Sequence, residues 1–111
     1  MDSTYEDWLN ARENARAAIR DVEAEGRRKA EAEAAYYAAK ATAYARLVAE
    51  TNATAAGNMV KGQPETNRAL LEFRMAEARY KAACSAAQLF TNEESHCYHE
   101  HRIAMGGDRE R

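Results

Sequence analysis

The apolar positions of the chain repeat at alternating spacings of three and four residues along two long stretches. In the first stretch the repeat starts near the beginning of the chain and returns after a run of small residues. Its members are Trp8, Ala11, Ala15, Ala18 and Val22, and then Tyr37, Ala41, Tyr44 and Val48. This spacing is typical of a helix that packs against another helix. It predicts a helix over about residues 4–50.

The second stretch follows Pro64 and keeps the same spacing without a polar interruption. Its members are Ala69, Phe73, Ala76, Tyr80, Ala83, Ala87 and Phe90. The line then turns polar, and Gly106 with Gly107 ends it, because glycine commonly closes a helix. The pattern predicts a second helix over about residues 64–104, followed by a disordered tail at 106–111.

Residues 57–65 separate the two stretches and hold the only proline and two of the five glycines of the chain. Gly62 suits the left-handed residue that closes a helical turn, while Gln63 suits an N-cap and Pro64 the first helical position. The chain is therefore expected to reverse here, with residues 51–63 as the connector.

The connector is itself expected to contain a short helix. Thr51 and Asn52 are poor helix formers, and either of them can cap a separate turn over residues 53–60. Together these elements predict an all-α chain. It is a long antiparallel helical hairpin with a short connector helix, folded as one domain over residues 1–105.

A hairpin folded within residues 51–63 also predicts which residues face one another. The expected pairs are Tyr37 with Tyr80, Tyr44 with Phe73, and Gly26 with Phe90. A glycine at position 26 then leaves room for the phenylalanine ring.

Leucine and methionine residues spread beyond this single seam, so two helices alone would leave apolar surface uncovered. A second copy of the chain is the expected cover, which predicts a coiled-coil-like homodimer or a higher oligomer. The aromatic residues of the expected core or oligomer seam are Trp8, Tyr37, Tyr44, Phe73, Tyr80 and Phe90.

Composition agrees with long exposed helices and narrows the function. Alanine fills 26 of the 111 positions, and charged residues make up 31%. The net charge of −2 provides no global field for nucleic acid or an anionic membrane. No apolar run approaches the roughly 20 residues of a membrane span, and the start lacks the features of a signal peptide. We therefore expect a cytoplasmic protein without membrane contact, in which Cys84 and Cys97 are reduced thiols.

Five arginines form the first candidate site. Arg12, Arg16 and Arg20 stand four residues apart on one side of the first helix, and Arg27 and Arg28 follow. Such a row can bind phosphates, acidic side chains or a nucleotide. Interspersed acidic residues favour the alternative, which is a solvated face with internal ion pairs.

Glu94, Cys97 and His101 form the second candidate site. They share one face of the second helix and offer a carboxylate, a thiolate and an imidazole, which are ligand types of zinc. No established zinc spacing is present, so the simpler interpretation is a polar last stretch of helix. We expect no metal and no other cofactor.

Catalytic motifs do not occur in the sequence. A phosphate-binding loop needs Lys and then Ser or Thr after its last glycine, whereas Gln63 and Pro64 follow Gly62. There is no nucleophile elbow, and Cys84 lies on an alanine-rich apolar face, where a thiol is usually inert. The chain is therefore expected not to be an enzyme.

Three short motifs carry a resemblance to a known group of proteins. They are Tyr36-Tyr37-Ala-Ala-Lys40, Val60-Lys61-Gly62-Gln63-Pro64-Glu65 and Arg74-Met-Ala-Glu77-Ala-Arg-Tyr80-Lys81. Over roughly residues 30–90 the chain resembles small alanine-rich helical proteins that phages and prophages encode. That group includes recombination partners, inhibitors of bacterial defence such as anti-CRISPR proteins, and sponges for signalling nucleotides.

The resemblance implies a non-enzymatic accessory protein of phage or prophage origin. Such a protein would bind and occlude a host protein in the bacterial cytoplasm, for example as an inhibitor of defence. The alternative is a nucleotide sponge, or a nucleic-acid-binding recombination accessory, that uses the arginine row.

Overall fold

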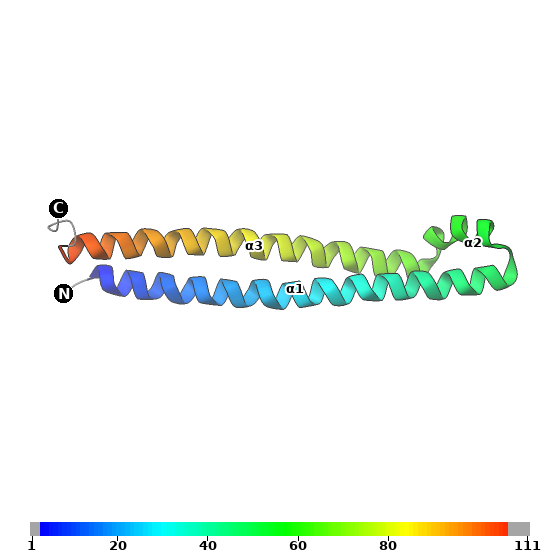
Figure 1. Cartoon of the computed structure of the whole chain (residues 1–111), viewed down its shortest axis with the longest axis horizontal. Coiled ribbons are helices and arrows are strands. Elements are labelled where there is room, and N and C mark those ends of the chain that lie inside the picture. Colours follow the sequence, from blue (N-terminus) through cyan, green and yellow to red (C-terminus); the bar gives the residue numbers. More distant parts are fainter. Residues whose placement is uncertain (1–2, 107–111) are drawn as a thin grey trace. The chain divides into compact units, whose positions relative to one another are not determined.

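The computed structural model describes residues 3–106, and nearly all of them are helical (Figure 1). Along the chain they form helix α1 (Ser3–Glu50), helix α2 (Ala53–Met59), the 3₁₀ helix η1 (Val60–Gly62) and helix α3 (Pro64–Ala104). No strand occurs among the described residues. The predicted all-α helical hairpin with a short connector helix is therefore confirmed. The predicted oligomer stays a prediction, and the predicted tail lies, apart from Gly106, outside the described residues.

The chain divides into two compact units, and each is described by itself. The turn unit is Glu25–Tyr80, and the terminal unit combines Met1–Ala24 with Lys81–Arg111. In both units a segment of α1 runs antiparallel to a segment of α3. No helix in the described part of the chain is long and apolar enough to cross a membrane.

Six of the eight buried apolar side chains in the described residues are alanines. The buried apolar side chains are Ala11, Ala15, Ala18, Ala43, Leu47, Ala56, Val60 and Ala76. Methyl side chains let two helices approach closely, but each removes little apolar area from water. The predicted seam at Ala11, Ala15 and Ala18 is confirmed, while many larger apolar side chains remain exposed.

The chain reverses at Thr51 and Asn52, earlier than predicted. The Thr51 hydroxyl closes α1 by donating to the Leu47 carbonyl at 2.6 Å. The Asn52 side chain then caps α2, because it accepts a hydrogen bond from the Ala55 N–H at 2.9 Å. The predicted cap is confirmed. The reversal therefore lies inside the predicted connector of residues 51–63. It does not lie at the corner of residues 57–65, as predicted, because α2 already packs back along α1.

The connector contributes to the core of the turn unit. Ala56 in α2 and Val60 in η1 cluster with Ala43 and Leu47 of α1, and each of these side chains is at most 4% exposed. Residues 53–62 are therefore packed against the end of α1 and do not form a free loop. This packing fixes the point at which α3 can start.

Helix α3 begins at Pro64, as predicted, after Gln63 in an extended conformation with φ −74° and ψ 135°. The Gln63 carbonyl accepts a hydrogen bond from the Asn67 N–H at 3.0 Å. The predicted left-handed conformation of Gly62 is wrong, since Gly62 lies in η1 and the described residues have a positive φ only at Gly106 (82°). Gly106 follows the end of α3, as the sequence predicted.

The pairing of the long helices in the turn unit differs from the predicted register. Phe73 stacks on Tyr36 of α1, with ring centroids 6.1 Å apart. Its predicted partner, Tyr44, lies eight residues further along α1. Gly26 is covered by Tyr80 and not by Phe90, because a Cβ on Gly26 would lie 3.4 Å from the Cε1 atom of Tyr80. Both predicted pairs are wrong for the same reason. The earlier reversal of the chain shifts α3 along α1 by about two turns.

This register leaves the predicted seam in the second half of α1 outside the core. Tyr44, which was predicted to face Phe73, is 39% exposed, and Tyr37 is 57% exposed. Ala43 and Leu47 are buried in their place. An alanine-rich helix is apolar over a wide arc, so two adjacent lines of residues can serve as its seam. Spacing alone does not choose between them.

Gly26 and Gly57 form a matched pair for testing the packing of the turn unit. A Cβ on Gly26 would touch the edge of the Tyr80 ring, whereas nothing lies within 4 Å of a Cβ on Gly57. Gly26→Ala should stabilise the fold by about 0.5–1 kcal/mol, because alanine is the better helix former. Gly26→Leu should be less stable than Gly26→Ala, because the larger side chain overpacks against Tyr80. Gly57→Leu should carry no such cost. Urea unfolding followed by circular dichroism measures these differences, and equal stability of the two leucine variants would contradict the contact.

Glu65 links the start of α3 to the end of α1. Arg46 donates a hydrogen bond to Glu65 Oε1 at 2.7 Å. A hydrogen bond with its own backbone, together with Arg46, lowers the pKa of Glu65 below the ordinary value of 4.5, although burial opposes the shift. A lowered pKa stabilises the fold above the unfolded-state pKa, and this contribution is lost as the pH falls through the folded-state pKa.

We therefore expect Glu65→Gln to reduce thermal stability near neutral pH and to match the wild type well below pH 4.5. Melting temperatures recorded across this range measure the difference. Glu72→Gln, an exposed change on the same helix, is the control. A Glu65→Gln difference that stays constant with pH would contradict the role of the Glu65 charge.

Candidate functional site

An uncovered apolar line on α1 is the main candidate surface of the turn unit. Tyr37, Tyr44 and Val48 are 57%, 39% and 36% exposed. They alternate with alanines, and the whole line, named the α1 stripe, is Ala30, Ala34, Tyr37, Ala41, Tyr44 and Val48. None of these positions carries a charge, although charged residues make up 31% of the chain. A surface of this kind is typical of one that another helix covers.

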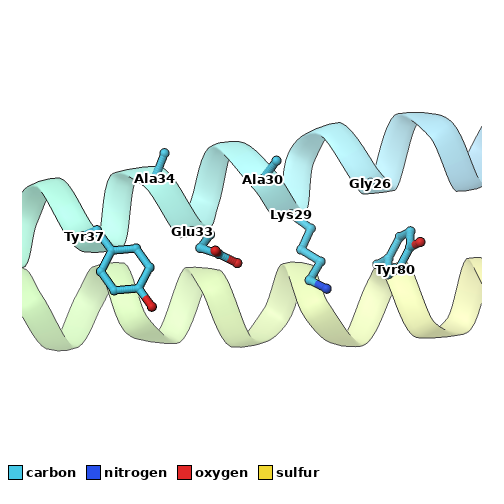
Figure 2. Close-up of a pocket in the computed structure, with 7 residues that line it drawn as sticks. All are labelled: Gly26, Lys29, Ala30, Glu33, Ala34, Tyr37 and Tyr80. Atoms are coloured by element: carbon cyan, nitrogen blue, oxygen red, sulfur yellow. The ribbon is translucent and has the colours of Figure 1, made fainter.

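A groove of about 410 Å³ opens beside the first half of the α1 stripe (Figure 2). Its lining residues are Gly26, Lys29, Ala30, Glu33, Ala34, Tyr37 and Tyr80. Figure 2 shows Lys29, Glu33 and Tyr37 directed toward α3, whereas the methyl groups of the two alanines point away from it. The Nζ atom of Lys29 lies 5.0 Å from the centroid of the Tyr80 ring. The groove is therefore lined by three small residues and two tyrosines, with one cation and one carboxylate.

Tyr37 and Tyr80, which the sequence predicts to face each other, both line this groove. The Tyr80 ring nevertheless lies against Gly26, eleven residues earlier on α1. The groove stays open because glycine and alanine side chains are too small to fill the space beside the two rings.

On α3, Leu71 and Met75 form a second uncovered apolar surface, named the α3 pair. They are one turn apart and are 61% and 46% exposed. Charged residues border them, because Glu72 is exposed and Arg74 forms an ion pair with Glu77 at 3.1 Å. An apolar centre inside a charged rim is the usual anatomy of a protein–protein contact.

The terminal unit contains an aromatic cluster that the sequence pattern did not predict. The Trp8 indole stacks on the His101 imidazole, with ring centroids 5.7 Å apart and planes 12° apart, and it meets the Tyr98 ring at 5.3 Å. Tyr5 also contacts His101, at 5.4 Å. The Oγ1 atom of Thr4 lies 3.2 Å from Nδ1 of His101. The sequence did contain a signal for this cluster. Aromatic residues lie near both ends of the chain, and an antiparallel hairpin brings those two ends together.

The first three arginines of the predicted anion site lie in the terminal unit. Arg12 lies over the Trp8 ring, with its guanidinium carbon 5.9 Å from the ring centroid. Arg20 lies 3.8 Å from Glu13, and Arg16 is exposed. Two of the three therefore already contact groups of their own chain.

Arg27 and Arg28, the other two candidates, lie in the turn unit. Arg28 forms an ion pair with Glu25, and Arg27 is exposed. These contacts are those expected of a solvated face with internal ion pairs. Anion binding by these residues stays a prediction.

Glu94, Cys97 and His101 do not come together as a metal site. His101 is engaged by Trp8, and the Cys97 thiol donates to Glu93 Oε1 at 3.5 Å. In the described part of the chain, no group of three or more His, Cys, Asp or Glu residues could hold a metal ion. The expectation that the protein binds no metal stays a prediction.

Cys97 borders a polar groove of about 480 Å³ in the terminal unit, whose lining includes Asp7, Glu93 and Glu100. Burial, the hydrogen bond to Glu93 and the charges of these carboxylates raise the pKa of the Cys97 thiol above the ordinary value of 9.0. The thiol is therefore protonated at neutral pH, and a protonated thiol is a poor nucleophile.

No family model matches the chain, and neither a curated protein nor a solved structure shows significant similarity to it. What the protein binds is therefore inferred from the surfaces of the two units.

The raised pKa of Cys97 predicts slow alkylation of this thiol. Glu93→Gln removes a negative charge beside Cys97, so it should speed the reaction with iodoacetamide severalfold at mildly alkaline pH. Glu94→Gln, one residue further along α3, is the matched control and should leave the rate unchanged. Mass spectrometry of peptides from timed reactions measures the rates. Equal rates in the wild type and Glu93→Gln would contradict the role of Glu93.

Proposed function

We propose that the protein is a non-enzymatic accessory protein that binds and occludes a host protein in the bacterial cytoplasm. The proposal combines the resemblance to phage and prophage proteins with an exposed surface that suits a protein partner. The protein acts stoichiometrically, because covering a surface of the partner is sufficient for inhibition and no turnover is needed.

The α3 pair is the observation that carries this proposal. Leu71 and Met75 are large apolar side chains that are 61% and 46% exposed. Full burial of such a side chain in a partner is worth about 1.5–3 kcal/mol. The flexible methionine adapts to an irregular pocket, and the charged rim formed by Glu72 and Arg74 orients the partner.

A nucleotide or nucleic acid is the alternative ligand, and it would require arginines that are free to bind phosphate. Arg12 lies over Trp8 and Arg20 lies beside Glu13, so the row has competing contacts within its own chain. The net charge of −2 also gives no long-range attraction for a polyanion. These observations favour a protein partner.

Changing Leu71 and Met75 together to Asp should abolish partner binding. Two carboxylates at the centre of the contact should weaken affinity at least about a hundredfold, because a charge cannot be buried there without a counter-charge. Tagged full-length protein first captures its partner from bacterial lysate, and calorimetry then measures affinity for that partner. Leu89→Asp is the matched control, because Leu89 also lies on α3 and is 70% exposed.

Full binding by the double variant would contradict the assignment of the α3 pair. Calorimetry with nucleic acid and cyclic nucleotides tests the alternative. A binding signal that is lost when Arg12, Arg16 and Arg20 are changed together to Glu would move the assignment to the arginine row. Failure to bind any host protein, nucleic acid or cyclic nucleotide would defeat both functions.

A further inference from the structure

The α1 stripe and its groove have no part in the proposed function, which acts through α3. We propose that this surface binds the same surface of a second copy of the chain. In this dimer the two α1 stripes run antiparallel about a two-fold axis that passes between the two α1 helices, at the level of residue 39. The structure contributes three supporting observations, which are the order of side-chain sizes, the open groove and the available area.

The order of large and small residues makes the α1 stripe complementary to itself in the antiparallel orientation. With the axis near Ala39, every large side chain of one copy faces an alanine of the other. The facing pairs are Tyr37 with Ala41, Tyr44 with Ala34, and Val48 with Ala30, and each pair occurs twice. Closely packed helices require this alternation, because a ridge on one helix must enter a gap on the other.

The groove provides space for the side chains of the second copy. Ala30 and Ala34 line it, and in the proposed register they receive Val48 and Tyr44 of the second copy. Glu33, which also lines the groove, can accept a hydrogen bond from the incoming tyrosine hydroxyl. A buried tyrosine needs such a partner for its hydroxyl.

The turn unit offers enough area for a stable dimer. From Gly26 to Val48 the helix rises about 33 Å, and two helices side by side present a face about 20 Å wide. The contact then covers roughly 650 Å² on each copy, or about 1,300 Å² in total, and stable interfaces begin near 1,200 Å². We expect a dissociation constant in the micromolar range, because three of the six stripe residues are alanines, which bury little apolar area.

Sedimentation equilibrium of the full chain tests the dimer. At tens of micromolar the mass should be twice 12.4 kDa. Ala34→Glu places a carboxylate against Tyr44 of the second copy and should weaken the dimer at least about a hundredfold. Helix content should not change, because Ala34 is exposed. Ala35→Glu is the matched control, since Ala35 is the next residue, is also exposed and lies off the stripe.

A monomer mass across the micromolar range would overturn the proposal, and so would a dimer that Ala34→Glu leaves unchanged. Tyr44→Ala is a second variant with a different chemistry, and it should also weaken the dimer. If both variants lost helix content, the mass of the molecules that remain folded would be compared with that of the wild type. A dimer mass for these folded molecules would again overturn the proposal.

Lys40 provides a test of the register. Its Nζ atom lies 6.0 Å from the centroid of the Tyr36 ring, and the proposed axis brings the two copies of Lys40 together. A mixture of wild type and Lys40→Glu should therefore form more mixed dimers than random pairing gives, because opposite charges then meet at the axis. Native mass spectrometry with one isotope-labelled partner measures this proportion. A random proportion would overturn the register.

The dimer and the proposed host binding should be separable. Ala34→Glu should keep host binding, and the double change of Leu71 and Met75 to Asp should keep the dimer mass. If either variant lost both properties while it stayed folded, one shared surface would explain them, and the assignment of self-association to the α1 stripe alone would be wrong.

Discussion

The small volume of the alanine side chain is the constraint on which the rest of the structure depends. Methyl groups at positions such as Ala15 and Ala76 let segments of α1 and α3 approach closely, but they bury little apolar area. An interior of this kind has little space for large side chains, and Leu47 is the only leucine among the buried residues of the described part of the chain. Many of the larger apolar side chains therefore lie on the outside, so the small residues that form the helix pair also account for the uncovered surfaces of both units.

The parts of the fold that could be predicted from the sequence are those that local interactions determine. The spacing of apolar residues and the absence of breakers specify two long helices. Asn52 and Pro64 specify where the second and third α-helices begin, because capping and the fixed φ of proline act within a few residues. Gly106 similarly marks the end of α3.

The register and the candidate surfaces could not be predicted, because they depend on contacts between distant residues. Two adjacent lines on α1 are apolar, and the packing of Ala56 and Val60 against Ala43 and Leu47 decides which one is buried. The sequence predicts a short helix in the connector, but it does not predict that this helix packs against α1. Its packing against α1 moves the reversal of the chain, and every predicted pair between the long helices moves with it.

The aromatic cluster makes the terminal unit visible to tryptophan fluorescence. Trp8 is the only tryptophan of the chain, and it stacks on His101 within the terminal unit. Indole emission responds to the groups that touch the ring, so tryptophan fluorescence, excited selectively, reports on the terminal unit alone. The far-ultraviolet circular dichroism of the helices, in contrast, is the sum of the contributions of both units. Comparison of the two signals during denaturation therefore reveals whether the units lose their structure together or one after the other.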